Sequence, residues 1–366
     1  MPAGALASTI GLVKGCVPTR STIPILNHVH VSASSGEVCV RGTNLDMDAV
    51  ARCEADVAQD GAVALPGEIL AGIVKRMPKS QMVTVSHDGE GRAEVVCGAA
   101  RYALRVLPAD DFPKPRGTAE GATFDMPCAV LRGMIETTRY ALSSGDDTRL
   151  FTLGAYLHVK DDRLAIVSND GHRLARQSCA LPAGAADMPG AIIPGMAMRE
   201  IHGMLDDGDV RVTVTDAEIR VEVARLRFAS VLIDTSYPPY ERVIPDLSGP
   251  HITIKPRALS DALERAAVLY TGTDVKAPSI GLQASNGAVE MDAGLAQFDT
   301  GKEAVDAAVH DLTASFRLNV KYFAEMLKLW PSDIDLDIQV TDGNGPVVFT
   351  ASEMPDVLHL IMPQRK

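Results

Sequence analysis

The sequence predicts an α+β protein made of three similar domains, each with two helices packed on antiparallel sheets. The main observation is a unit of about 125 residues that recurs three times. Within each unit, amphipathic helix patterns are followed by alternating strand patterns. A chain of 366 residues is also longer than one hydrophobic core usually organises. We expect domain limits at residues 1–121, 122–249 and 250–366.

The second helix of each unit is the clearest part of the repeat. A proline opens the first two copies, and a Pro or an Asp-Gly pair ends all three. The helices are expected at PGEILAGIVKRMP (residues 66–78), PGMAMREIHGMLDDG (194–208) and NVKYFAEMLKLWPSD (319–333).

Strand patterns follow these helices. Residues 82–97, 210–223 and 334–351 alternate apolar and polar residues on both sides of a polar turn, which predicts three hairpins. Each unit also has a closing strand and an earlier helix. The closing strands are expected within residues 101–113, 225–240 and 357–366, and the earlier helices at 6–17, 127–142 and 256–270.

The composition is typical of a globular protein, with 46% hydrophobic and 22% charged residues. The six cysteines form no CxxC motif and no cluster, which argues against a structural zinc site or a disulfide framework. The N-terminal residues lack the basic start and long apolar core of a signal peptide, and no apolar run is long enough to span a membrane. We expect a cytoplasmic protein with reduced cysteines and no cofactor or metal.

The charge is divided unevenly along the chain. The net charge of -12 argues against nucleic-acid binding if it is taken alone. However, the six expected helices carry ten basic and six acidic residues, which leaves 25 basic and 41 acidic residues for the rest of the chain. If the helices share one side, they form a positive wall suited to a polyanion. The excess of basic residues on the helices is explained equally well if these are ordinary solvent-exposed helix faces, which often carry Lys and Arg.

The segment SNDGHRLARQ (residues 168–177) places Ser168, Asp170 and His172 close together in sequence. No G-x-S-x-G elbow, HExxH motif or phosphate-binding loop surrounds them, so no enzyme motif is complete. Asn-Asp-Gly favours a tight turn between two strands. A hydrolase that uses His172 and Asp170 remains an alternative.

Eight short stretches, in order along nearly the whole chain, resemble the β subunit of bacterial DNA polymerase III, the processivity sliding clamp. They are STIPILNHVHV (21–31), GTNLDMDAVAR (42–52), LPADDFP (107–113), VSNDGHRLA (167–175), YPPYERVIP (237–245), ERAAVLY (264–270), LNVKYFAEML (318–327) and IMPQRK (361–366).

The resemblance implies a clamp fold whose head-to-tail homodimer closes into a ring around duplex DNA and tethers a polymerase without catalysing a reaction. It implies a dimer contact between the first and third domains, with Val268 and Leu269 near it. It also assigns Arg20 and Arg149 to DNA. The charge division adds a set of lining candidates on the helices. They are Lys75, Arg76, Arg132, Arg139, Arg199, Arg257, Arg265, Lys321 and Lys328.

The resemblance further implies a pocket for a short apolar peptide from polymerases, the clamp loader and repair proteins. Apolar walls are expected from Leu174, Val243, Met362 and Pro363, and polar contacts from Arg173 and Arg242. His172 is expected to be a wall of the pocket. The full set is Gly171, His172, Arg173, Leu174, Pro238, Arg242, Val243, Asn319, Tyr322, Leu360, Ile361, Met362, Pro363, Gln364 and Arg365.

Several positions depart from the family pattern. Asn169 stands where clamps commonly have Thr, and Lys366 puts a charge at a usually apolar end. Leu150 and Phe151 replace a pair of tyrosines found in some clamps. The first strand is expected to be shortened or lost. A diverged phage-type or plasmid-type clamp with its own partners is therefore an alternative.

Overall fold

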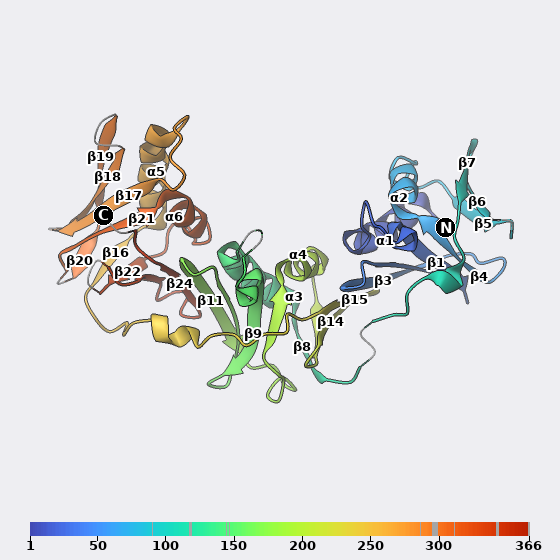
Figure 1. Cartoon of the computed structure of the whole chain (residues 1–366), viewed down its shortest axis with the longest axis horizontal. Helices are drawn as coiled ribbons and strands as arrows, with labels where there is room; N and C mark the ends of the chain where they lie inside the picture. The colour runs from blue at the N-terminus through green and yellow to red at the C-terminus, as the bar shows by residue number, and fades with distance from the viewer. Residues whose placement is uncertain are drawn as a thin grey trace. The chain divides into compact units, whose positions relative to one another are not determined.

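The structure, a computed structural model, describes residues 1–89, 91–116, 119–143, 145, 147–285, 287–294, 299–310, 312–341 and 344–364 (Figure 1). The chain forms two compact units. The first comprises Met1–Leu131 and Pro182–Leu232, and the second comprises Arg132–Leu181 and Ile233–Lys366. Both units combine helices with antiparallel sheets, so the predicted α+β class is confirmed.

The first unit is built on antiparallel strands. These are β1 (His28–Ser34), β2 (Glu37–Thr43), β3 (Met47–Glu54), β4 (Gly61–Pro66), β5 (Val83–His87), β6 (Arg92–Cys97), β7 (Ala100–Arg105), β8 (Ala122–Pro127), β12 (Ala191–Pro194), β13 (Asp209–Val214), β14 (Glu218–Val223) and β15 (Leu226–Val231). One sheet has the order β4-β1-β2-β3-β15-β14-β13-β8, and a second has the order β5-β6-β7. The pairing of Ala49 with Phe228 joins β3 to β15, which are distant in sequence.

Three helices belong to the first unit: α1 (Ala3–Val13), α2 (Gly67–Lys75) and α4 (Gly195–Met204). Helix α1 carries no charge and buries Leu6, Ile10 and Val13, which lie on one helical face. It packs against α2 and β3. Pro66 and Pro194 are N-caps with non-helical backbone, so each helix begins one residue later than predicted. Short 3-10 turns are η1 (Lys14–Cys16), η2 (Pro24–Asn27) and η3 (Ala109–Asp111).

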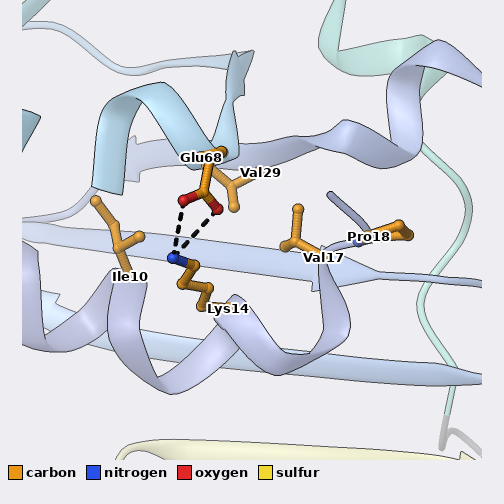
Figure 2. A pocket seen from close by; sticks show the side chains of 7 residues that line it. Ile10, Lys14, Val17, Pro18, Val29 and Glu68 are labelled. Atoms are coloured by element: carbon orange, nitrogen blue, oxygen red, sulfur yellow. Dashed lines mark hydrogen bonds and ion pairs between the residues drawn. The ribbon is translucent and has the colours of Figure 1, made fainter. Parts of the chain in front are cut away.

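A small cavity lies between the end of α1 and the start of α2 (Figure 2). Its volume is about 10 Å³, which is room for about one water molecule. An ion pair of 3.1 Å between Lys14 and Glu68 crosses it, as Figure 2 shows. The cavity is therefore a packing feature between two helices and is too small for a ligand.

The second unit has its own antiparallel strands. These are β9 (Gly154–Lys160), β10 (Arg163–Asn169), β11 (Arg173–Ala180), β16 (His251–Ile254), β17 (Ser279–Ser285), β18 (Ala288–Gly294), β19 (Thr300–Asp306), β20 (Ala308–His310), β21 (Ala314–Asn319), β22 (Leu336–Val340), β23 (Val347–Thr350) and β24 (Val357–Ile361). The strands β9-β10-β11-β24-β23-β22-β16-β20 are consecutive neighbours within one sheet, and β19-β18-β17-β21 forms another. Leu174 pairs with Leu360 where β11 meets β24.

Helices α5 (Pro256–Ala267) and α6 (Val320–Leu327) pack against each other in the second unit. Leu259 and Leu263 of α5, with Phe323 and Met326 of α6, lie in its main hydrophobic core. The sequence boundary between the two units falls within helix α3 (Cys128–Thr138), between Leu131 and Arg132. Short 3-10 turns are η4 (Arg139–Ala141), η5 (Leu150–Leu153), η6 (Tyr240–Val243) and η7 (Val268–Tyr270).

All six predicted helices occur close to their expected positions. The earlier helices are α1, α3 and α5, each continued by a 3-10 turn, and the later ones are α2, α4 and α6. The expected short first strand is a single bridge between Pro2 and Met82. The domain limits at 121 and 249 stay a prediction. In the part of the chain that the structure describes, no helix has both the length and the apolar character needed to cross a membrane.

Candidate functional site

The turn between β10 and β11 is held by two side chains that accept backbone hydrogen bonds. Asn169 Oδ1 accepts from the Gly171 N–H at 2.6 Å. Asp170 Oδ1 accepts from the N–H groups of His172 and Arg173 at 2.9 and 3.0 Å. Gly171 has a φ of +85°, which a residue with a Cβ rarely adopts. The predicted turn at Asn-Asp-Gly is confirmed.

Arg173 connects this turn to α6. Its Nε donates to Asp170 Oδ2 at 2.9 Å, and its Nη1 donates to Glu325. The guanidinium carbon lies 4.3 Å from the ring centre of Tyr322 and 5.0 Å from that of Tyr140. Burial by itself would lower the pKa of Arg173, but the hydrogen bonds to Glu325 and Asp170 raise it, so the group stays charged. The Arg173 side chain is only 8% exposed, and it links the carboxylates of Asp170 and Glu325.

The C-terminal segment closes over the same turn. The Met362 N–H donates to the His172 carbonyl at 2.8 Å. The rings of His172 and Tyr322 lie 6.2 Å apart between centroids. Asn319 caps α6 by accepting from the N–H groups of Lys321 and Tyr322, which places Tyr322 in the first turn of the helix. Residues from β11, α6 and the chain end therefore meet at one surface.

Apolar side chains are exposed near this surface. Val243 is 47% exposed and Met362 is 37% exposed. Leu150 was not predicted as part of the site, and it is 53% exposed. By contrast Leu174 and Leu360 are buried, so their side chains belong to the core beneath the surface.

The remaining predicted pocket residues differ in exposure. Ile361 is fully buried, whereas Pro238, Pro363 and Gln364 are partly exposed. The Gln364 N–H donates to the Arg317 carbonyl at 2.8 Å, which fixes the segment beside β21. Arg365 and Lys366 lie outside the described residues.

Arg149 lies against the turn, and its assignment to DNA by resemblance stays a prediction. Its Nη2 donates to the Asp170 carbonyl at 2.9 Å and to Asp147 at 2.8 Å. The Arg149 guanidinium holds the pKa of Asp147 well below its usual range. A Cβ on Gly171 would lie 2.3 Å from Arg149 Nη1, so the glycine makes room for the arginine. No local motif signalled this contact, because the two segments are separated in sequence.

The residues of the alternative hydrolase do not form a catalytic relay. The Asp170 carboxylate accepts from two backbone N–H groups and from Arg173 rather than from the His172 imidazole. Ser168 is fully buried. Among the described residues, no group of three or more His, Cys, Asp or Glu could hold a metal ion. The arrangement is suited to binding.

The predicted DNA-lining residues lie on helices or directly after them, and their side chains are exposed except for the half-buried Arg132. Arg265 and Arg257 have acidic partners within the chain. Arg265 donates to both carboxylate oxygens of Glu303 at 2.9 and 2.6 Å, and this hydrogen bonding lowers the pKa of Glu303. Arg257 lies 3.9 Å from Asp261. Of the residues assigned to DNA, those with exposed side chains are Arg20, Lys75, Arg76, Arg139, Arg149, Arg199, Arg257, Arg265, Lys321 and Lys328.

The two predicted dimer-contact residues lie on η7. Val268 is 65% exposed, which is unusual for a valine. Leu269 is partly buried and packs against the core of the second unit. Val268 therefore offers an uncovered apolar side chain at the end of α5.

Three family models match consecutive parts of the chain. They describe the N-terminal domain of the DNA polymerase III beta subunit over residues 3–115, its central domain over 125–239 and its C-terminal domain over 241–365.

Individual proteins match over nearly the whole chain. The beta sliding clamp of Pseudomonas putida KT2440 is 28% identical over 364 residues, which are 99% of this chain and 98% of that protein. The beta sliding clamp of Escherichia coli K12 is 28% identical over 96% of this chain and 95% of its own.

Solved structures are similar in fold. The Bartonella birtlesii sliding clamp bound to griselimycin has a TM-score of 0.94 and 26% identity, with 100% of this chain and 99% of that chain covered. The Pseudomonas aeruginosa clamp bound to griselimycin has a TM-score of 0.94 and 27% identity, with 100% and 98% covered.

Proposed function

The chain belongs to the DNA polymerase III beta subunit family, and from this premise we propose how it works as a DNA sliding clamp. A sliding clamp catalyses no reaction; it is the processivity factor of a DNA polymerase. The observation that carries this function is the run of three consecutive clamp domains, matched over residues 3–365 with short gaps.

Two copies of the chain form a closed ring around duplex DNA. Each copy contributes three domains, at residues 1–121, 122–249 and 250–366. The exposed Val268 supports a contact at the end of α5, since an apolar side chain that is 65% exposed gains from being covered. A head-to-tail contact of this kind closes into a ring when the rotation per subunit is right. The ring acts in the cytoplasm, where the bacterial chromosome is copied.

The helices face the DNA and hold it by charge alone. Lys75 and Arg76 at the end of α2 and Lys321 at the start of α6 are exposed cations that can reach the phosphate groups of a nucleic acid. Phosphate contacts of this kind carry no sequence information. Weak contacts let the ring slide, while its closure keeps it from leaving the DNA.

Partner proteins bind at the turn of residues 169–173 and the C-terminal segment. Val243, Met362 and Leu150 are the exposed apolar side chains that would cover a Leu or Phe of the partner, at about 1.5 to 3 kcal/mol for each buried side chain. Arg149 and Arg242 would contact polar groups of the peptide. Arg173 positions the turn. A polymerase, a clamp loader and repair proteins share this surface through a short apolar peptide.

The DNA assignment is tested by loading the protein onto nicked circular DNA with a bacterial clamp loader and ATP. Reversing Lys75, Arg76 and Lys321 together to Glu is expected to reduce loading strongly. The control reverses Arg52, Arg211 and Arg225, which are exposed but lie on or between strands, so the change in net charge is the same. Equal loading by both triple variants would refute the helix lining.

A further inference from the structure

Five aromatic rings form a cluster in the second unit, beside the proposed partner surface. The Tyr156 ring stacks on the Tyr237 ring at 4.7 Å and on the His158 ring at 4.4 Å, with interplanar angles of 8° and 10°. Tyr240 meets the edge of His158 at 5.6 Å. Phe151 meets Tyr237 at 5.8 Å. Tyr156 and His158 alternate along β9, so both point to the same side of the strand.

One end of this ring cluster holds η6. His158 Nε2 lies 3.2 Å from the Tyr240 hydroxyl, within hydrogen-bond distance. Lys160, two residues further along β9, forms an ion pair with Glu241, and its ammonium lies 6.0 Å from the ring centre of Tyr240. Arg242 and Val243 follow directly. Strand β9 therefore fixes the segment that presents these two residues.

The other end of the ring cluster holds η5. Phe151 contacts Tyr237, and its neighbours in sequence are the exposed Leu150 and then Arg149. Arg149 in turn donates to the carbonyl of Asp170 in the turn. The rings therefore join the two segments that carry Leu150 and Val243, neither of which belongs to the turn itself.

We propose that Tyr156 and His158 are positioning residues for partner binding, which set the places of η5 and η6 through the ring cluster without touching the partner. This inference rests on the proposed function of the surface. It adds two residues of β9, Tyr156 and His158, that affect the affinity for the partner although they do not contact it. Because stacked rings tolerate little displacement, loss of the Tyr156 ring shifts both segments at once.

The cluster also makes partner binding sensitive to acid. His158 is 7% exposed and faces Tyr156, Tyr240, Lys160, Glu241 and Arg176. Burial lowers the pKa of His158 and is the largest effect. A backbone hydrogen bond with Tyr156 and the charge of Glu241 raise this pKa by less, and the charges of Lys160 and Arg176 lower it by smaller amounts still. The ring is therefore neutral above its ordinary pKa of 6.5 and takes up a proton only in acid. A charged ring in this stack loosens η6.

The test measures the affinity of a capped, uncharged peptide carrying Gln-Leu and a terminal Leu-Phe, by fluorescence anisotropy on the full chain. Tyr156→Ala is expected to weaken binding about tenfold, the equivalent of about one aromatic contact. Tyr156→Phe keeps the stack and should bind as the wild type does. Tyr102→Ala, which removes an exposed tyrosine from β7 of the first unit, is the control and should change nothing.

The pH profile gives a second readout. As the pH falls below 6.5, wild-type affinity is expected to fall more steeply than that of His158→Phe, which keeps a ring but cannot take up a proton. If Tyr156→Ala does not fold, Lys160→Ala at the exposed end of β9 replaces it and should weaken binding about threefold, as expected for an exposed ion pair.

The outcomes distinguish a failure of this inference from a failure of the proposed partner-binding function. A wild-type chain that does not bind the peptide contradicts the proposed partner surface and the inference with it. A wild-type chain that binds, together with a folded Tyr156→Ala of equal affinity, overturns the inference alone. Identical pH profiles of the wild type and His158→Phe would also overturn it.

Discussion

The guanidinium of Arg173 lies 4.3 Å from the ring centre of Tyr322, so a residue of β11 is held directly against the first turn of α6. Asp170 and Glu325 pair with the same guanidinium. Arginine can fill this place because its flat group stacks and donates in several directions together, which lysine cannot do.

Arg173→Lys is therefore expected to destabilise the second unit and to weaken peptide binding. Loss of one partner from a buried pair typically costs about 3 to 5 kcal/mol, and the retained charge of lysine should reduce the loss to about half of that. Chemical unfolding and peptide titration measure the two effects. Arg163→Lys is the control, since Arg163 of β10 pairs with Asp356 at the surface with 41% exposure. If Arg173→Lys and Arg163→Lys are equally stable, the contacts of Arg173 do not stabilise the second unit.

Gly171→Ala should disturb Arg149 in addition to straining the backbone. Gly89, between β5 and β6, offers a matched control, because its φ of +80° is close to the +85° of Gly171 but nothing lies within 4 Å of an added Cβ. Both alanine variants should lose about 1 to 2 kcal/mol of stability from the positive φ. Only Gly171→Ala should also weaken peptide binding. Unchanged affinity would show that the place of Arg149 does not matter for the partner.

Val243→Asp and Met362→Asp should each reduce peptide affinity by tenfold or more, because a carboxylate replaces an apolar contact worth about 1.5 kcal/mol or more. Folding should be nearly unaffected, since both side chains are substantially exposed. Ile23→Asp serves as the control, with a side chain 46% exposed in the first unit. Calorimetric titration measures the peptide affinity of each variant. If both Val243→Asp and Met362→Asp bind the peptide as the wild type does, this surface is not the peptide-binding site.

His359 should make the stability of the protein depend on pH. It is fully buried, shares a 2.9 Å hydrogen bond with the Tyr140 hydroxyl, and burial lowers its pKa from 6.5 to about 3. The unfolded chain therefore binds a proton between these values that the folded chain does not. The stability that depends on a neutral His359 is complete above pH 6.5 and is lost as the pH falls towards 3.

His359→Asn keeps a hydrogen-bonding group near Tyr140 and cannot titrate. Between pH 6 and pH 4, its free energy of unfolding should fall by about 1.4 kcal/mol less per pH unit than that of the wild type. Urea titrations at several pH values measure both slopes. Parallel slopes would mean that His359 takes up its proton in the folded protein as well.

Much of the fold could be predicted because its signals are local. The helices follow from amphipathic spacing and from prolines, and the turn at residues 169–171 follows from Asn-Asp-Gly. The one-residue shift at α2 and α4 arises because the backbone of Pro66 and Pro194 is non-helical, with ψ of 109° and 144°. Spacing alone does not distinguish a cap from a first helical residue.

The surroundings of the site were harder to predict, because they depend on contacts between distant segments. The peptide contact of Arg173 stays a prediction. Nothing near Arg173 in the sequence indicated that it would meet Tyr322 and Glu325 of α6, the second of which is 152 residues away. The assignment of Arg149 to DNA stays a prediction, and its contact with the Asp170 carbonyl is one that the resemblance did not indicate. Amino-acid type predicted the charge of both arginines but not which groups they would meet.

The protein is expected to hold DNA by enclosing it. The most direct measurement loads labelled protein onto a nicked circular plasmid, isolates the complex, and then cuts the plasmid once with a restriction enzyme. Protein should stay on the intact circle in high salt and should leave soon after the cut, because a ring slides off a free end. Equal retention on cut and uncut DNA would contradict enclosure.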